Sequence, residues 1–189
     1  MEHIELEGYK LVARRDRTDG RSGGGIVAFA NDSVFERVTL IATSDTAERC
    51  WLLIHAGQGP YLLCTWYRPP TAGEINTIDT FKIEFEELSQ QALGTLCIGD
   101  INVHHRQWLH HSSHDSAEGK RMKDVSEELG LQQKVQQQTR QGHLLDLVLT
   151  NIPGTNAKVR PAISDHELVL AELKFTMPKR EIVKRKVWL

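Results

Sequence analysis

The chain has 189 residues, of which 40% are hydrophobic and 25% are charged, and its formal charge at pH 7 is −2. This length and composition indicate one globular domain with a hydrophobic core, and they exclude a disordered chain. The near-neutral charge excludes nucleic-acid binding through overall basicity, although basic residues cluster over 14–21 and 174–186. Such local clusters either attract a phosphate backbone or form an ordinary solvated surface.

The sequence also restricts where the protein works. Its three cysteines, Cys50, Cys64 and Cys97, form no CxxC motif and no disulfide framework, so we expect reduced, buried thiols. The N-terminal sequence MEHIELEGYK does not resemble a signal peptide, and no apolar run approaches the length of a membrane span. We therefore expect a nuclear or cytoplasmic protein that is not secreted and has no membrane partner.

The hydrophobic pattern predicts about eight short strands and two helices. In chain order these are strands over 10–14, 26–30, 34–40, 50–55 and 61–66, a helix over 75–93, a strand over 95–98, a helix over 117–129, and strands over 144–150 and 164–174. Strands in runs favour an α+β fold with antiparallel sheets in a layered sandwich. We expect one domain over 1–176 and a basic linker over 177–189.

Several of these strands contain or end in polar side chains that packing alone would not choose. They are Asp100 and Asn102 in GDIN, Asp146 in LLDLVLT, Asp165 and His166 in SDHELV, and Tyr67 before two prolines. Because burying a lone carboxylate is costly, three acids in apolar contexts are best explained if they converge on one site. Carboxylates suit a hard cation such as Mg²⁺, and an imidazole transfers protons near neutral pH. The pattern indicates a hydrolytic phosphodiester site, with a capped turn as the alternative for SDH alone.

The motifs GDIN, LLDLVLT and SDHELV, in that order after a YRPP turn, resemble those of the endonuclease/exonuclease/phosphatase superfamily. More narrowly, GDINVHHRQW is similar to a run in the endonuclease domain of non-LTR retrotransposons, and the resemblance covers nearly the whole chain. It implies a four-layered, DNase I-like α/β sandwich with two mostly antiparallel sheets flanked by helices. It also implies a Mg²⁺-dependent endonuclease that nicks DNA, with Mn²⁺ as an alternative ion. The partner in a longer polyprotein would be a reverse transcriptase domain.

The resemblance implies roles at the C-terminal motifs. Asp165 would be a metal ligand or its close neighbour. His166 would contact the scissile phosphate or act as the base, and Asp146 would orient His166 through a hydrogen bond.

Three more roles follow from the same resemblance. Asp100 would handle the proton of the attacking water or of the leaving group. Asn102 would position Asp100 or the phosphate, and Tyr67 would contact the phosphate.

The sequence departs from the family at its start. The family's two N-terminal strands, the second of which carries a metal-binding Glu, have no counterpart, and Glu2, Glu5 and Glu7 do not lie in that motif. We therefore expect the fold without those strands and an activity impaired by truncation. The alternative is a catalytically inactive remnant that binds nucleic acid. A relative that acts on phospholipid or inositol phosphates is a third hypothesis, which the HHRQW run disfavours. For the histidines of 104–114, we expect a solvated or DNA-facing loop rather than a zinc site.

Overall fold

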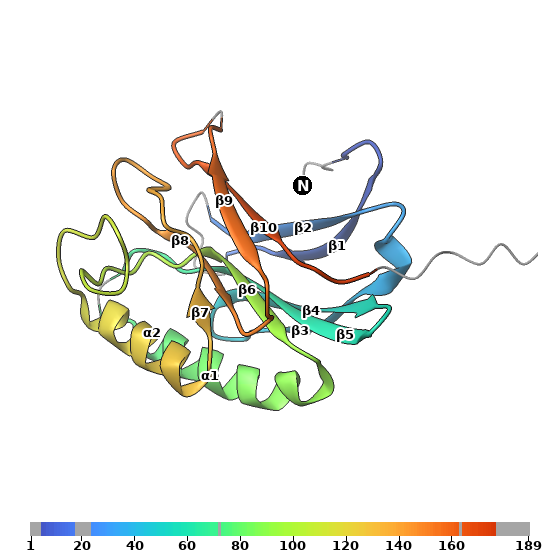
Figure 1. Ribbon diagram of the computed structural model, residues 1–189, viewed down its shortest axis with the longest axis horizontal. Coiled ribbons are helices and arrows are strands. Elements are labelled where there is room, and N and C mark those ends of the chain that lie inside the picture. The colour runs from blue at the N-terminus through green and yellow to red at the C-terminus, as the bar shows by residue number, and fades with distance from the viewer. Residues whose placement is uncertain (1–4, 18–23, 72, 163, 177–189) are drawn as a thin grey trace, which may run out of the picture.

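A computed structural model describes residues 5–17, 24–71, 73–162 and 164–176, so the predicted linker lies outside the described residues. Figure 1 shows the arrangement of the elements along the chain. In chain order they are β1 (Tyr9–Arg15), β2 (Ile26–Asn31), the 3-10 helix η1 (Phe35–Arg37), β3 (Val38–Thr43), β4 (Glu48–Ala56), β5 (Gly59–Tyr67), α1 (Asn76–Leu88), the 3-10 helix η2 (Ser89–Gln91), β6 (Thr95–Asp100), α2 (Ala117–Glu128), β7 (Gln132–Gln133), β8 (Asp146–Thr150), β9 (Asn156–Arg160) and β10 (Leu168–Glu172).

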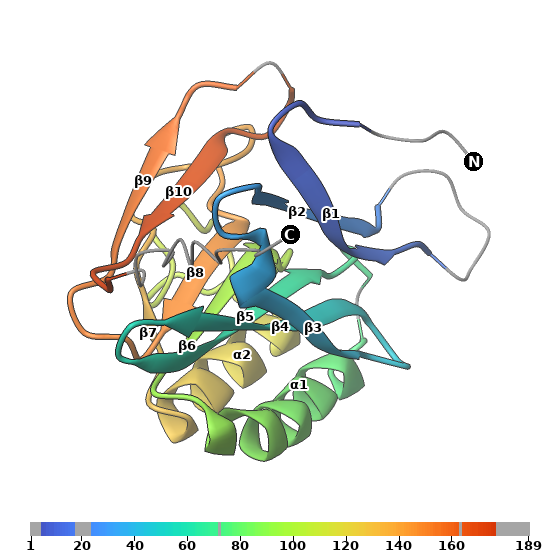
Figure 2. The ribbon, with the colours of Figure 1, turned by 90° about the vertical axis from the view of Figure 1, so that its right-hand side faces the viewer.

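The centre of the molecule is a six-stranded sheet with the order β3-β4-β5-β6-β8-β7. Strands β5 and β6 run parallel, and every other neighbouring pair in this sheet is antiparallel. Both α1 and α2 cover one face of the sheet, and two narrow sheets, β1-β2 and β9-β10, lie over the other face (Figures 1 and 2). The predicted α+β class is confirmed. The described residues form three layers rather than the four expected, because both helices lie on the same side.

Strand β4 shows why the central sheet forms where the sequence is continuously apolar. Its side chains alternate between two covered faces, so Trp51 contacts Phe81 of α1 while Cys50 and Leu52 pack against β1 and β2. A strand buried on both faces requires apolar residues at successive positions. The segment CWLL meets that requirement, and its residues are almost fully buried.

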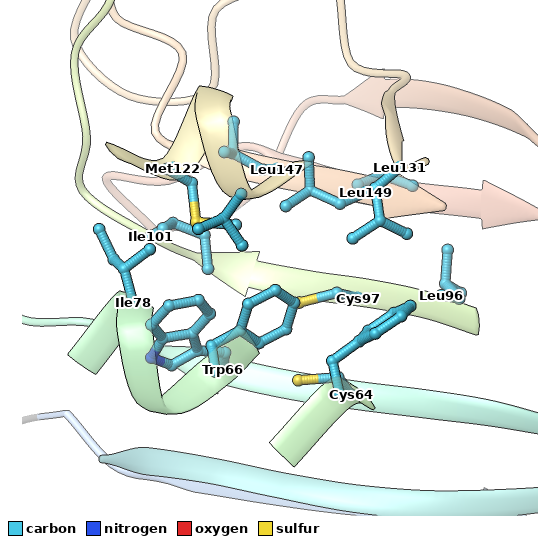
Figure 3. Packing of buried hydrophobic residues seen from close by; sticks show 14 of the residues in the cluster. Cys64, Trp66, Ile78, Leu96, Cys97, Ile101, Met122, Leu131, Leu147 and Leu149 are labelled. Carbon is cyan, nitrogen blue, oxygen red and sulfur yellow. The ribbon is translucent and has the colours of Figure 1, made fainter. Parts of the chain in front are cut away.

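The two helices complete the main core. Helix α1 buries Ile78 and Phe81 against Trp66 of the sheet, and Met122 of α2 joins them together with Leu147 and Leu149 of β8 (Figure 3). The ring centroids of Trp66 and Phe81 lie 5.1 Å apart in a stacked arrangement. None of the helices among the described residues is long and apolar enough to cross a lipid bilayer.

Some predicted boundaries are wrong. The helix over 75–93 ends at Leu88, and residues 35–37 of the predicted strand 34–40 form the 3-10 helix η1. The strand over 164–174 begins at Leu168, because residues 164–167 form a turn that carries His166. Strand β9 was not expected, because NAKVR lacks the alternation of apolar and polar residues that marks a half-buried strand.

Candidate functional site

Three side chains from separate parts of the sequence meet at one end of the central sheet. Asp100 ends β6, Asp146 begins β8, and His166 lies in the turn before β10. The Nδ1 atom of His166 lies 2.8 Å from Oδ2 of Asp146, and its Nε2 atom lies 3.7 Å from Oδ2 of Asp100. One ligand atom from each residue lies within 4.8 Å of the others, so the three are spaced to hold a metal ion.

The two acids meet because of strand register. Strands β6 and β8 are antiparallel, and Asp100 and Asp146 are directly opposed partners in the ladder. Directly opposed residues bring their side chains to about 5 Å on the same face of a sheet. The pairing continues past the strand, since the N–H of Ile101 donates to the carbonyl oxygen of Leu145 at 3.0 Å.

The imidazole is held by the turn that carries it. The Ser164 hydroxyl donates to the carbonyl oxygen of His166 at 2.9 Å and accepts from its N–H at 3.3 Å. The N–H of Glu167 also donates to the carbonyl oxygen of Thr139 at 2.7 Å. The SDH segment is thus both a turn closed by Ser164 and a carrier of a site residue. The two interpretations of this motif are compatible.

Burial and charge make Asp100 unusual among the acids. Its burial, followed by the nearby carboxylate of Asp146, raises the pKa of Asp100 to about 6, and the charge of His166 opposes the rise. Its Oδ1 atom is buried without a hydrogen-bond partner. An unpartnered carboxylate oxygen beside a second carboxylate fits a hard divalent cation, which prefers oxygen ligands. The same raised pKa lets Asp100 gain or release a proton near neutral pH.

Asp165 is placed differently from its neighbour His166. Its carboxylate forms an ion pair with Arg140, whose Nη2 lies 2.7 Å from Oδ2 of Asp165, and the Asp165 side chain is 56% exposed. The group spaced for a metal ion does not include it. Arg140 also lies near enough to Asp100 to lower the pKa of that acid. Asp165 therefore borders the site through Arg140.

Asn102 and Tyr67 are both neighbours of Arg68, but only Asn102 is placed close to the three converging groups. Asn102 follows Asp100 in the turn after β6, and its Nδ2 donates to the carbonyl oxygen of Arg68 at 2.9 Å. Tyr67 ends β5 and lines a hollow together with Arg15 and Arg68. The structure thus brings Asp100, Asp146 and His166 into contact and places Asn102 beside them through Arg68.

Two site-bordering arginines were missed by sequence reasoning. Arg68 is almost fully buried and bonds to the GDIN turn, and Arg140 pairs with Asp165. The sequence signal for Arg68 was its position inside YRPP, where a charged residue stands next to two prolines at the end of an apolar strand. We find no comparable signal for Arg140.

The histidine-rich run contributes a cluster of rings next to the site. The ring of His104 lies 4.3 Å from that of His114 and 5.4 Å from that of His143, measured between centroids. Burial, followed by these two neighbours, lowers the pKa of His104. Among the described residues these histidines are not part of a group spaced for a metal.

Comparison with known proteins places these features in a family context. The sequence model described as endonuclease-reverse transcriptase matches residues 61–170, a segment that contains all three converging side chains. No curated protein sequence matches the chain.

Solved structures share the fold at low sequence identity. The endonuclease domain of TRAS1, a telomere-specific non-LTR retrotransposon, matches with a TM-score of 0.69 and 16% identity over 89% of this chain and 81% of that one. The catalytic domain of human Nocturnin with bound sulfate matches with a TM-score of 0.59 and 14% identity over 89% and 73%. An endonuclease/exonuclease/phosphatase family protein from Bacteroides thetaiotaomicron matches with a TM-score of 0.50 and 12% identity over 87% and 72%.

Proposed function

The chain belongs to the endonuclease-reverse transcriptase family, and on that premise we propose that it is a metal-dependent endonuclease domain that hydrolyses phosphodiester bonds in DNA. The observation that carries this proposal is the convergence of Asp100, Asp146 and His166 from three separate segments. Two carboxylates and an imidazole in a half-buried cluster provide oxygen ligands and a proton-transfer group at one point. A metal-dependent phosphodiesterase can use both, the metal for charge stabilisation and the imidazole for proton transfer.

His166 and Asp146 form the proton-transfer pair. With Nδ1 of His166 bonded to Asp146 at 2.8 Å, the other ring nitrogen, Nε2, faces Asp100. Asp146 holds the imidazole in one orientation, as an acid behind a catalytic histidine does. His166 therefore accepts a proton at Nε2 or donates one there to a phosphate oxygen. The pKa of Asp100 is about 6 without a cation. A bound cation would keep this carboxylate ionised, and it would then handle the proton of the attacking water or of the leaving group as an acceptor.

Asp100 and Asp146 would hold the divalent cation, which is Mg²⁺ in our proposal with Mn²⁺ as an alternative. The cation would supply positive charge against the phosphate oxygens. We propose that Asn102 and Tyr67 contribute hydrogen bonds to the phosphate from the turns that follow β6 and end β5. Asp165 is proposed as a neighbour of the metal, and it would have to leave Arg140 to act as a ligand.

The proposed substrate and context follow from the family and from the shared fold. We infer that the substrate is DNA and that a reverse transcriptase domain accompanies this domain in a longer polyprotein. The family description and the likeness to a retrotransposon endonuclease domain support this inference. A nuclear or cytoplasmic location is proposed with it, since such a substrate is found there.

Nicking of supercoiled plasmid by the purified chain tests the proposal. We expect relaxation with Mg²⁺, none with EDTA, and a rate lower by about 10²–10⁴-fold in His166→Ala, since proton-transfer groups contribute that much. His55→Ala is the matched control, because His55 is an exposed histidine on β4, and it should nick as the wild type does. Nicking that survives EDTA or the loss of His166 would exclude the proposed site. A folded chain that binds plasmid in a salt-sensitive manner without nicking it would instead identify an inactive binding module.

A further inference from the structure

Arg68 is a buried arginine with an unusual set of partners. It follows Tyr67 at the end of β5, and its side chain is 2% exposed. Its guanidinium donates to four backbone carbonyl oxygens, those of Pro69 at 3.4 Å, Thr71 at 3.1 Å, Glu74 at 3.5 Å and Asn102 at 3.3 Å. Burying a charge is costly unless its donors are hydrogen-bonded, and here the two terminal nitrogens are bonded while Nε is buried without a partner; burial lowers the pKa of Arg68. The side chain therefore stabilises two loops at once.

The bonds between Arg68 and the GDIN turn run in both directions. The backbone N–H of Arg68 donates to the carbonyl oxygen of Asp100 at 2.8 Å. The Nδ2 of Asn102 donates to the carbonyl oxygen of Arg68 at 2.9 Å. The guanidinium of Arg68 in turn donates to the carbonyl oxygen of Asn102. Asn102 has a φ of 49°, in the left-handed region that asparagine enters more readily than most other non-glycine residues. Asn102 makes both of these side-chain bonds with Arg68 while in this conformation.

Glu118 links the same arginine to helix α2. Its carboxylate lies 3.8 Å from Nη2 of Arg68 and accepts the N–H of Gly73 at 2.5 Å. Glu118 lies in the first turn of α2, which begins at the capping residue Ser116. Ser116 also bonds to the loop that follows the GDIN turn, because its N–H donates to the carbonyl oxygen of His104 at 2.9 Å. The Arg68–Glu118 pair thus joins β5, the GDIN turn and α2.

We propose that Arg68, anchored by Glu118, is a positioning residue that fixes Asn102 and the end of β6 in the arrangement the nuclease reaction needs. The inference deepens the proposed function and rests on it. Arg68 acts through Asn102 and Asp100. Lysine cannot replace it, because an ammonium is a point charge, whereas the planar guanidinium fork reaches carbonyl oxygens on both loops.

Arg49 provides a matched control for a buried arginine outside the site. Its side chain is fully buried, and its Nε lies 2.8 Å from Oε2 of Glu84. It also donates to the carbonyl oxygen of Thr77 at 3.2 Å and stacks 4.6 Å from the ring centroid of Trp66. These partners tie α1 to the central sheet. Arg49→Lys therefore disturbs the core to a similar degree without removing a bond to the GDIN turn.

The first test compares Arg68→Lys with Arg49→Lys in the full chain by thermal unfolding and by nicking kinetics below the lower Tm. Both variants should unfold at lower temperature than the wild type. We expect Arg68→Lys to lower kcat by about 100-fold with little change in KM, because small displacements at a reacting centre cost that much. Arg49→Lys should keep kcat. Equal losses of kcat in the two variants, or none in Arg68→Lys, would overturn the proposal.

A second measurement does not depend on activity. The side-chain amide signals of Asn102, assigned by NMR with an Asn102→Ser variant, should shift and exchange faster with water in Arg68→Lys but not in Arg49→Lys. Unchanged Asn102 signals in Arg68→Lys would overturn the positioning role even if the wild type nicks DNA. If the wild type does not nick, the proposed function fails, and shifted signals still show that Arg68 holds the turn.

Glu118→Gln replaces Arg68→Lys if the lysine variant does not fold. The substitution keeps the volume of the side chain and removes the charge that anchors Arg68. We expect the same Asn102 amide shift in weaker form and a smaller loss of kcat. Signals and kcat identical to those of the wild type would count against the anchoring role of Glu118 and against the proposal.

Discussion

The central sheet and the two narrow sheets differ in how much of each strand is buried. Strands β4 and β8 of the central sheet are buried along most of their length, because helices cover one face and the narrow sheets cover the other. Strand β10 alternates between exposed and half-buried residues, and its partner β9 has no buried position. Most of the large hydrophobic side chains exposed on strands belong to the narrow sheets: Tyr9, Leu11, Val27, Leu168 and Leu170.

The three residues of the candidate site come from both kinds of sheet. Asp100 and Asp146 belong to the central sheet, so their separation is set by the register of a well-buried ladder. His166 belongs to the turn that leads into a narrow sheet, and it is held by Ser164 and by its bond to Asp146. Regions with few buried apolar contacts open more readily than the core. We therefore expect the two acids to stay in place when the histidine turn moves.

The largest stability effect should come from the core of the central sheet. Leu149 on β8 is fully buried among helix and sheet side chains. Leu149→Ala should lower the free energy of unfolding by about 2–5 kcal/mol, because it leaves a cavity that the rigid surroundings cannot fill. Urea denaturation followed by circular dichroism measures the change. A loss as small as that of a surface substitution would show that the central sheet is not the stable part of the molecule.

The next largest effect concerns ion pairs in the two regions. Arg49→Met leaves Glu84 partly buried without its cation and should lower the free energy of unfolding by about 3 kcal/mol. Adding Glu84→Gln should restore part of that loss, which a double-mutant cycle measures. The pair Lys158–Glu172 on the narrow sheet is exposed, and Lys158→Met should leave the urea midpoint unchanged. Equal losses for the two pairs would contradict the contrast between the sheets.

The pH dependence of stability should reveal Asp100. Its pKa is raised from 3.8 to about 6 in the folded state, so the folded chain binds its proton more tightly than the unfolded chain does. The resulting stability is fully present below pH 4 and is lost as the pH rises through 6. In buffer with EDTA, Asp100→Asn should therefore match the wild type near pH 4 and exceed it by about 2 kcal/mol at pH 7. Stability curves that stay parallel from pH 4 to 7 would exclude a raised pKa at this position.

The smallest effect is expected on the outer face of a narrow sheet. Leu168 on β10 is 49% exposed, so replacing its side chain removes few packing contacts. Leu168→Ser should change the free energy of unfolding by less than about 0.5 kcal/mol, as surface substitutions do. Chemical denaturation of this variant and of Leu149→Ala compares the free energy of unfolding lost at the surface of a narrow sheet with that lost in the core of the central sheet. A large loss would mean that the face is covered in solution.

Much of the fold follows from local patterns. Continuous apolar runs predicted the buried strands of the central sheet, and apolar residues at helical spacing predicted α1, because burial on one face or two imposes a period on the sequence. The end of α2 was predicted from Gly130. The same reasoning missed β7 and β9, since QQ and NAKVR carry no apolar period. It also missed that both helices cover the same face of the central sheet. Periodicity shows which side of a helix or strand is buried, but it does not show which other element covers that side.

The candidate site shows the same division. The sequence by itself determined that Asp100, Asp146 and His166 lie in or at the end of predicted apolar strands, because such residues interrupt an otherwise apolar pattern, and the structure then placed Asp146 at the start of its strand and His166 in a turn. Only the tertiary structure decided which of them meet. The antiparallel register of β6 and β8 places the two acids opposite each other, and Arg140 holds Asp165 outside the group. Strand pairing joins residues far apart in the chain, and no local pattern specifies which strands become neighbours.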